Sequence, residues 1–178
     1  VYHRIFERLY PAVEDPADLA QLLAALPAVA GAVLDEAPQQ EGFRATAWWR
    51  ETRAEIEQNV RRSLEALAET QGEFVPYRYE AIFGLRGQPS LVVCDGEFHC
   101  RLRGLIDPLD RSSAGRLRSV DYKTAGPAAF TKRAVAEGKK LQVPLYALAA
   151  RQALELGEPV EGFYWHVQQA SASSFTLD

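Results

Sequence analysis

The run Val120-Asp121-Tyr122-Lys123-Thr124 decides how this 178-residue chain is interpreted. Its β-branched and aromatic residues favour an extended strand. Side chains alternate across a strand, so Asp121 and Lys123 point to the same face. We expect Gly104-Leu105-Ile106-Asp107 to end the preceding strand, where antiparallel pairing can bring Asp107 beside Asp121.

These three side chains form a combination that suits a particular chemistry. Two carboxylates a few Å apart repel each other, and both stay ionised most easily when a cation lies between them. Carboxylate oxygens suit Mg²⁺ or Mn²⁺, and a lysine beside such an ion can orient a water or stabilise charge on a phosphate. Asp107, Asp121 and Lys123 therefore predict a phosphodiester hydrolysis site. Asp121 and Lys123 alone would equally suit an exposed charge pair on a strand.

The composition is that of a folded globular domain: 47% of the residues are apolar, 25% are charged, and the formal net charge is −4. These values exclude collagen-like, disulfide-scaffold and intrinsically disordered proteins, and the length suits one domain, 1–178. Because no run reaches about 18 uncharged apolar residues and no secretory signal is visible, we expect no membrane partner and a cytoplasmic location. The chain starts at Val1 and contains no Met, so we expect it to be excised from a larger protein or trimmed.

The sequence changes character near residue 75. Residues 1–75 are expected to be mostly helical, with helices at 2–9, 15–26 and 46–70 and with Pro27 ending the second. Residues 76–178 carry β-branched and aromatic residues between turn signals, which predicts a catalytic α/β core. Its expected strands are 77–85, 90–94, 97–107, 117–123 and 160–169, and its expected helix is 137–156. Asp95-Gly96 predicts a tight hairpin, and Asp110–Gly115 predicts a second turn.

The acidic total hides a basic window at residues 101–140. It holds four acids, Asp107, Asp110, Asp121 and Glu137, and ten bases: Arg101, Arg103, Arg111, Arg116, Arg118, Lys123, Lys132, Arg133, Lys139 and Lys140. Such a window can attract a polyanion even in an acidic chain. A solvated surface of strands and loops would have the same composition.

Four elements occur in a fixed order: His3 with Glu7 on the first helix, then the segments around Asp107 and Asp121, then Gln142-Val143-Pro144-Leu145-Tyr146. This order resembles the RecB-like branch of the PD-(D/E)XK nuclease superfamily, which includes RecB- and AddB-type proteins and CRISPR-associated exonucleases. The resemblance implies a restriction-endonuclease-like α/β core, a central mixed sheet flanked by helices, with an N-terminal helical elaboration.

The resemblance also implies roles for individual residues. Asp107 and Asp121 look like the acidic metal ligands, with His3 and the Tyr122 backbone carbonyl as further ligands of Mg²⁺ or Mn²⁺. Lys123 looks like the catalytic lysine. Positions i and i+4 share a helix face, and this pair, Gln142 and Tyr146, looks like the one that places substrate or lysine. Glu80 resembles an acidic residue of the family's first strand, and it suits either support of the site or an ordinary strand position.

The sequence departs from the branch in two places. Pro108 follows the first aspartate where the family often has Arg, and we expect Asp110 to shape the turn or pair with an arginine rather than bind metal. Some relatives carry an iron–sulfur cluster on four cysteines. Cys94 and Cys100 do not match those places, so we expect no cluster.

The leading hypothesis is a metal-dependent deoxyribonuclease, of exonuclease type, acting in DNA repair or recombination. Its expected partners are DNA and a helicase or other domains of a larger protein. The alternative is a catalytically inactive nucleic-acid-binding or scaffolding module on the same fold, and a third interpretation is an unrelated hydrolase of small phosphate esters. Trp48, Trp49 and Tyr77 suit either stacking on bases or burial in a core.

Overall fold

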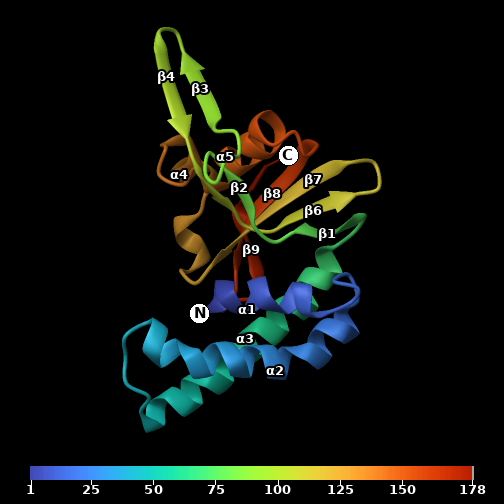
Figure 1. The fold of residues 1–178 in the computed structure, drawn as a ribbon, viewed down its shortest axis with the longest axis vertical. Coiled ribbons are helices and arrows are strands. Elements are labelled where there is room, and N and C mark those ends of the chain that lie inside the picture. Colours follow the sequence, from blue (N-terminus) through green and yellow to red (C-terminus); the bar gives the residue numbers. More distant parts are fainter. Residues whose placement is uncertain (178) are drawn as a thin grey trace. The chain divides into compact units, whose positions relative to one another are not determined.

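The structure is a computed structural model that describes residues 1–177. It contains two compact units, both drawn in Figure 1. The first consists of Val1–Gly72 and His166–Ser171, and the second of Glu73–Trp165 and the C-terminal segment from Ala172. The single-domain organisation and the larger parent protein stay predictions.

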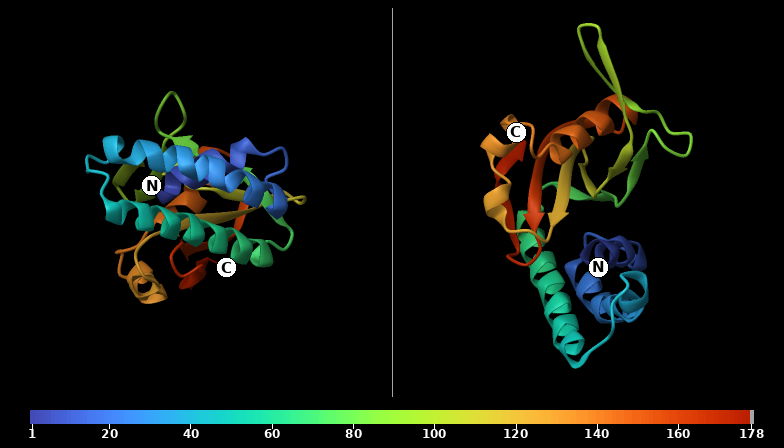
Figure 2. Two further views of the ribbon diagram at one scale, coloured as in Figure 1. Left: turned by 90° about the horizontal axis from the view of Figure 1, so that it is seen from below. Right: turned by 90° about the vertical axis from the view of Figure 1, so that its left-hand side faces the viewer.

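Three helices build the first unit: α1 (Tyr2–Leu9), α2 (Leu19–Gln40) and α3 (Ala47–Thr70), with a 3-10 turn, η1 (Tyr10–Ala12), after α1. Asp18 caps α2, because its Oδ1 accepts a hydrogen bond from the backbone N–H of Ala20 at 2.8 Å. Figures 1 and 2 show α2 and α3 side by side. The core of this unit lies between the apolar stripes of the three helices.

The prediction that Pro27 ends a helix is wrong, because α2 continues through Pro27 and Pro38 to Gln40. Residues on both sides of Pro27, such as Leu26 and Ala30, are fully buried on one stripe. Their burial outweighs the cost of one lost hydrogen bond. By length and composition α2 could cross a membrane, but the core helix of a folded domain meets the same criteria.

A mixed five-stranded sheet forms the centre of the second unit. Its strand order is β1 (Phe74–Arg78), β6 (Leu109–Ser112), β7 (Arg116–Lys123), β8 (Glu158–His166) and β9 (Ser171–Leu177). Two smaller antiparallel pairs accompany it: β2 (Ala81–Phe83) with β5 (Gly104–Ile106), and β3 (Leu91–Asp95) with β4 (Phe98–Leu102). The β3–β4 hairpin projects from the rest of this unit in Figures 1 and 2. The α/β architecture, with helices flanking a mixed sheet and an N-terminal helical part, is confirmed.

The helices of the second unit follow β7 along the chain. They are η2 (Pro127–Ala129), α4 (Lys132–Ala136), α5 (Gln142–Leu148) and a π-helical turn, η3 (Ala149–Ala153). The expected helix 137–156 therefore begins only at Gln142, since Gly138 adopts a positive φ of 75° and ends α4. Because α5 packs on β7, residues of these two elements meet over the sheet.

Several strand boundaries differ from those predicted. The expected strands 77–85 and 97–107 are each divided, into β1 and β2 and into β4 and β5, and the halves pair in different sheets. At Gly84 (φ 67°) a Cβ would lie 2.6 Å from the Cβ of Arg103, so the chain bends where the two divided strands approach each other. Strand β6 occupies part of the expected turn, and β9 was not predicted. The Asp95-Gly96 hairpin and the strand at 117–123 are confirmed within one residue.

Candidate active site

Strand pairing brings Asp107 to Asp121. Strands β6 and β7 pair Asp110 with Arg118 and Leu109 with Ser119, and the Val120 N–H donates to the Pro108 carbonyl at 3.1 Å. Continuing the register by one residue beyond this Pro108–Val120 pair places Asp107 opposite Asp121. The two carboxyl groups approach closely enough to share a proton, so the juxtaposition expected from the sequence is present.

Asp121 is a fully buried carboxyl group, at 0% exposure, on the central strand β7. Burial first, and then the hydrogen bond and negative charge of Asp107, raise its pKa to about 7, although the Lys123 ammonium acts in the opposite direction. Lys123 Nζ lies 2.8 Å from Asp121 Oδ2 as an ion pair, outside good hydrogen-bond alignment. In its ionised form, Asp121 therefore has no aligned donor at either oxygen among residues 1–177. Two such oxygens beside a second carboxylate fit a hard divalent cation.

Asp107 lies just beyond β5 and is partly buried. Burial raises its pKa, and the negative charge of Glu80 acts in the same direction, whereas Asp121 and Lys123 lower it. Glu80, which precedes β2, is therefore near enough to influence Asp107 while remaining exposed. Its supporting role stays a prediction.

The Lys123 ammonium is held from the other side by α5. Lys123 Nζ donates to Oε1 of Gln142, the first residue of α5, at 2.7 Å. One turn later, the Tyr146 hydroxyl bonds with Gln142, and its pKa is raised by burial and by the charges of Asp107 and Asp121. The structure thus brings the predicted pair Gln142 and Tyr146 to the two aspartates and Lys123, and the roles of all five stay predictions.

Three residues near Lys123 were not predicted from the sequence to belong to the site: Phe130, Lys140 and Tyr164. The rings of Phe130 and Tyr164 lie 6.0 and 5.8 Å from Lys123 Nζ, and Lys140 Nζ lies 4.5 Å from the Phe130 ring. The Tyr164 hydroxyl donates to the Lys140 carbonyl at 2.9 Å and accepts from the Val143 N–H at 3.4 Å. Tyr164 therefore fixes the start of α5. The sequence carries no local signal for this, because Tyr164 lies about 40 residues after Lys123.

A buried ion pair braces the same two strands. Arg118 donates from Nη2 and Nε to Asp110 Oδ2, at 2.7 and 2.9 Å, which confirms the expectation that Asp110 pairs with an arginine. The guanidinium lies 4.9 Å from the ring of Phe74 and 5.9 Å from that of Phe163. Burial raises the pKa of Asp110, and Arg118 lowers it. Asp110 and Arg118 each lie three residues from an aspartate of the site, so the pair holds β7, which carries Asp121, to β6, which follows Asp107.

The remaining predicted metal ligands are His3 and the Tyr122 backbone carbonyl. His3 is an exposed residue of α1 in the first unit, whereas Asp107 and Asp121 belong to the second. The Tyr122 side chain is buried on the face of β7 opposite Asp121. Residues 1–177 contain no group of three or more His, Cys, Asp or Glu side chains placed to hold a metal ion. Ligation by His3 and by the Tyr122 carbonyl stays a prediction.

Comparison with known proteins identifies the family of the chain. The model of a family described as the PD-(D/E)XK nuclease superfamily matches residues 1–176. No curated protein matches the chain. The superfamily inferred from the motifs is confirmed, and the RecB-like branch stays a prediction.

Proposed function

The chain belongs to the PD-(D/E)XK nuclease superfamily, whose members are hydrolases that act on nucleic acids, and we propose that it is a metal-dependent DNA nuclease. One observation carries the proposal: Asp107, Asp121, Lys123 and Gln142 form a continuous chain of contacts on and beside β7. A carboxylate pair next to a positioned ammonium suits phosphodiester hydrolysis.

Superfamily members generally use divalent metal ions. Asp107 and Asp121 would hold Mg²⁺ or Mn²⁺, with His3 and the Tyr122 carbonyl as further candidate ligands. When bound, the ion would supply positive charge to the attacked phosphate and make a water more acidic.

Side chains of the protein itself stabilise charge on the phosphate and contact the substrate. Lys123 holds a positive charge beside the carboxylates, where it can stabilise the charge that develops on the phosphate. Gln142 fixes the direction of this ammonium through its 2.7 Å hydrogen bond. Tyr146 borders the same site through Gln142 and can contact the substrate.

The type of cleavage, the branch of the superfamily and the partners can be proposed as well. We propose exonuclease-type cleavage in DNA repair or recombination, by a RecB-like domain that a helicase or other parts of a larger cytoplasmic protein deliver to DNA. The order of the four sequence motifs supports the branch. The basic window at residues 101–140 supports a polyanionic partner.

The test is a cleavage assay with end-labelled single- and double-stranded DNA in Mg²⁺, Mn²⁺ or EDTA. We expect cleavage with metal only, progressing from ends, and its loss in Asp121→Asn and Lys123→Ala. Asp95→Asn, at the exposed hairpin tip, is the matched control and should cleave normally. Unchanged cleavage in both site variants would show that the site is wrong. Hydrolysis of a small phosphate ester without DNA cleavage would favour the small-ester hydrolase.

A second candidate is a non-catalytic nucleic-acid-binding or scaffolding module on the same fold. It is favoured by the observation that residues 1–177 assemble no three-residue metal group. Calorimetric titration with Mn²⁺ separates the two: the nuclease binds the ion through Asp107 and Asp121 and loses binding in Asp121→Asn. No binding at millimolar Mn²⁺ would favour the non-catalytic module.

A further inference from the structure

The connection between α2 and α3 exposes aromatic residues that the proposed cleavage site does not use. Residues 41–48 are all exposed, and the Trp48 side chain reaches 75% exposure, so the alternative that Trp48 belongs to a core is wrong. Phe43, at 38% exposure, packs edge-on against Trp49 with ring centroids 4.8 Å apart. Exposed aromatic area of this kind marks an interaction surface.

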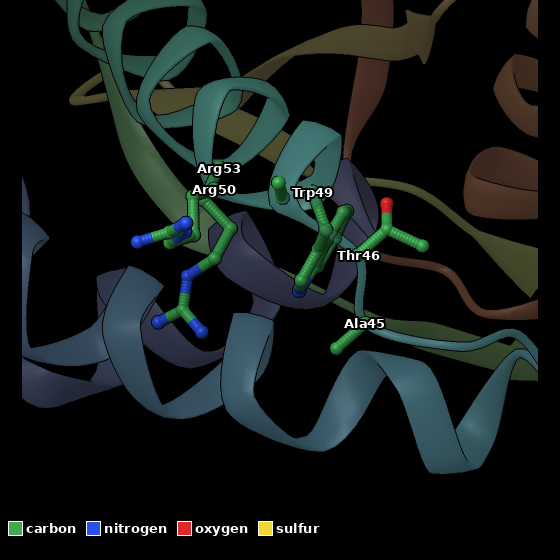
Figure 3. Close-up of a pocket in the computed structure, with 6 residues that line it drawn as sticks. Ala45, Thr46, Trp49, Arg50 and Arg53 are labelled. Carbon is green, nitrogen blue, oxygen red and sulfur yellow. The ribbon is translucent and has the colours of Figure 1, made fainter.

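A groove of about 570 Å³ lies beside these rings (Figure 3). It is lined by the connection and the first two turns of α3: Ala45, Thr46, Ala47, Trp49, Arg50 and Arg53. Figure 3 shows the Trp49 and Arg50 side chains extending from α3 toward the α2 ribbon. Trp49 Nε1 is a buried donor without a hydrogen-bond partner among residues 1–177. The groove therefore offers an aromatic wall, in a volume suited to a small ligand group.

The charges around the groove favour an anionic occupant. Arg53 is paired with Asp35 at 2.5 Å, but Arg44 and Arg50 make no ion pair within the part of the chain that the structure describes. Of the nearby acids, Glu41 is paired with Arg4 at 2.8 Å. Glu51 is directed about 160° away from Trp49 around α3, although it lies only about 60° from Trp48. Two free guanidinium groups thus flank the exposed rings.

We propose that the α2–α3 surface, formed by Phe43, Arg44, Trp48, Trp49 and Arg50, binds single-stranded nucleic acid. Bases stack on Trp48 and Trp49, and Arg44 and Arg50 contact the phosphates. Only unpaired bases expose the faces that these rings need, so the surface prefers single strands to duplex. The proposal rests on the family's action on nucleic acids, and it requires no cleavage at Asp107 and Asp121.

The test measures binding of a fluorescein-labelled oligothymidylate to the 178-residue chain in EDTA by fluorescence anisotropy. Removing one stacking ring costs about 5- to 150-fold in affinity, and we expect this loss in Trp48→Ala. Trp48→Leu should lose nearly as much, because it keeps apolar area without a π-face, whereas Trp48→Phe should retain most of the affinity. Arg50→Gln should lower the slope of log affinity against log salt by about 0.7.

Matched controls separate this surface from the cleavage site. Arg61→Gln, on the same helix but paired with Glu57, should leave the salt slope unchanged. Because binding is measured in EDTA, where the proposed metal-dependent cleavage does not occur, failure of the proposed nuclease site would leave this result intact. Unchanged affinity in both Trp48→Leu and Arg50→Gln would overturn the proposal and favour a protein partner on this surface. Equal affinity for a duplex of the same length would also overturn it.

Discussion

The buried pair of Asp110 and Arg118 allows a sharp test of how the sheet is held around the site. Asp110→Asn removes the carboxylate that accepts two hydrogen bonds from Arg118, at 2.7 and 2.9 Å. The guanidinium, 3% exposed, would then stay buried between two aromatic rings without a counter-charge. Breaking a buried ion pair on one side costs about 3–5 kcal/mol. With a urea m-value of about 2 kcal/mol/M, the unfolding midpoint should fall by about 2 M.

The measurement is urea unfolding at neutral pH, with two comparison variants. Glu73→Gln breaks the exposed ion pair of Arg116 on the same strand β7, and it should cost at most about 1 kcal/mol. The double variant Asp110→Leu with Arg118→Met should recover most of the lost stability. Burial raises the pKa of Asp110 even though Arg118 lowers it, so desolvation of the charged pair outweighs its attraction. An Asp110→Asn cost no greater than that of Glu73→Gln would refute the reasoning, as would a double variant less stable than Asp110→Asn.

Three further predictions concern the site and the helical unit. Because burial and Asp107 raise the pKa of Asp121 to about 7, the metal-free folded chain holds a proton that the unfolded chain releases near pH 4. The free energy of unfolding in EDTA should therefore fall by up to about 4 kcal/mol as pH rises from 4 to 7, and urea titrations of Asp121→Asn should show no such fall. Gln142→Leu should slow single-turnover DNA cleavage while leaving the calorimetric Mn²⁺ affinity unchanged, because its contact is with Lys123. Pro27→Ala should raise the unfolding free energy by up to about 3 kcal/mol in urea, since position 27 is exposed inside a continuous helix.

The parts of the fold that depend on local chemistry could be predicted from the sequence. Asp95-Gly96 forms the expected hairpin because a two-residue turn with a positive φ at glycine needs no distant partner. The alternation along Val120–Lys123 likewise placed Asp121 and Lys123 on one face of β7. Both features are set within a few residues.

The parts of the fold that depend on tertiary contacts could not be predicted from the sequence. Asp110 belongs to a turn by composition, yet its ion pair with Arg118 and the burial of Leu109 make this segment strand β6. Pro27 is tolerated because the stripe of α2 is buried on both sides of it. Tyr164 reaches the start of α5 from a strand far along the chain, and Trp48 is exposed although its residue type favours burial.

The buried carboxylates of Asp110 and Asp121, on the adjacent strands β6 and β7, differ in how they are stabilised. Asp110 is satisfied, with two aligned hydrogen bonds from Arg118. Asp121 is more deeply buried, yet in its ionised form neither of its oxygens has an aligned donor among residues 1–177. The Lys123 ammonium lies 2.8 Å from Oδ2, but a buried carboxylate without aligned donors still destabilises a fold. Stability alone would therefore favour an apolar side chain at position 121. This asymmetry favours a cation at Asp121 and a purely structural role for Asp110, and the nuclease proposal follows from the same contrast.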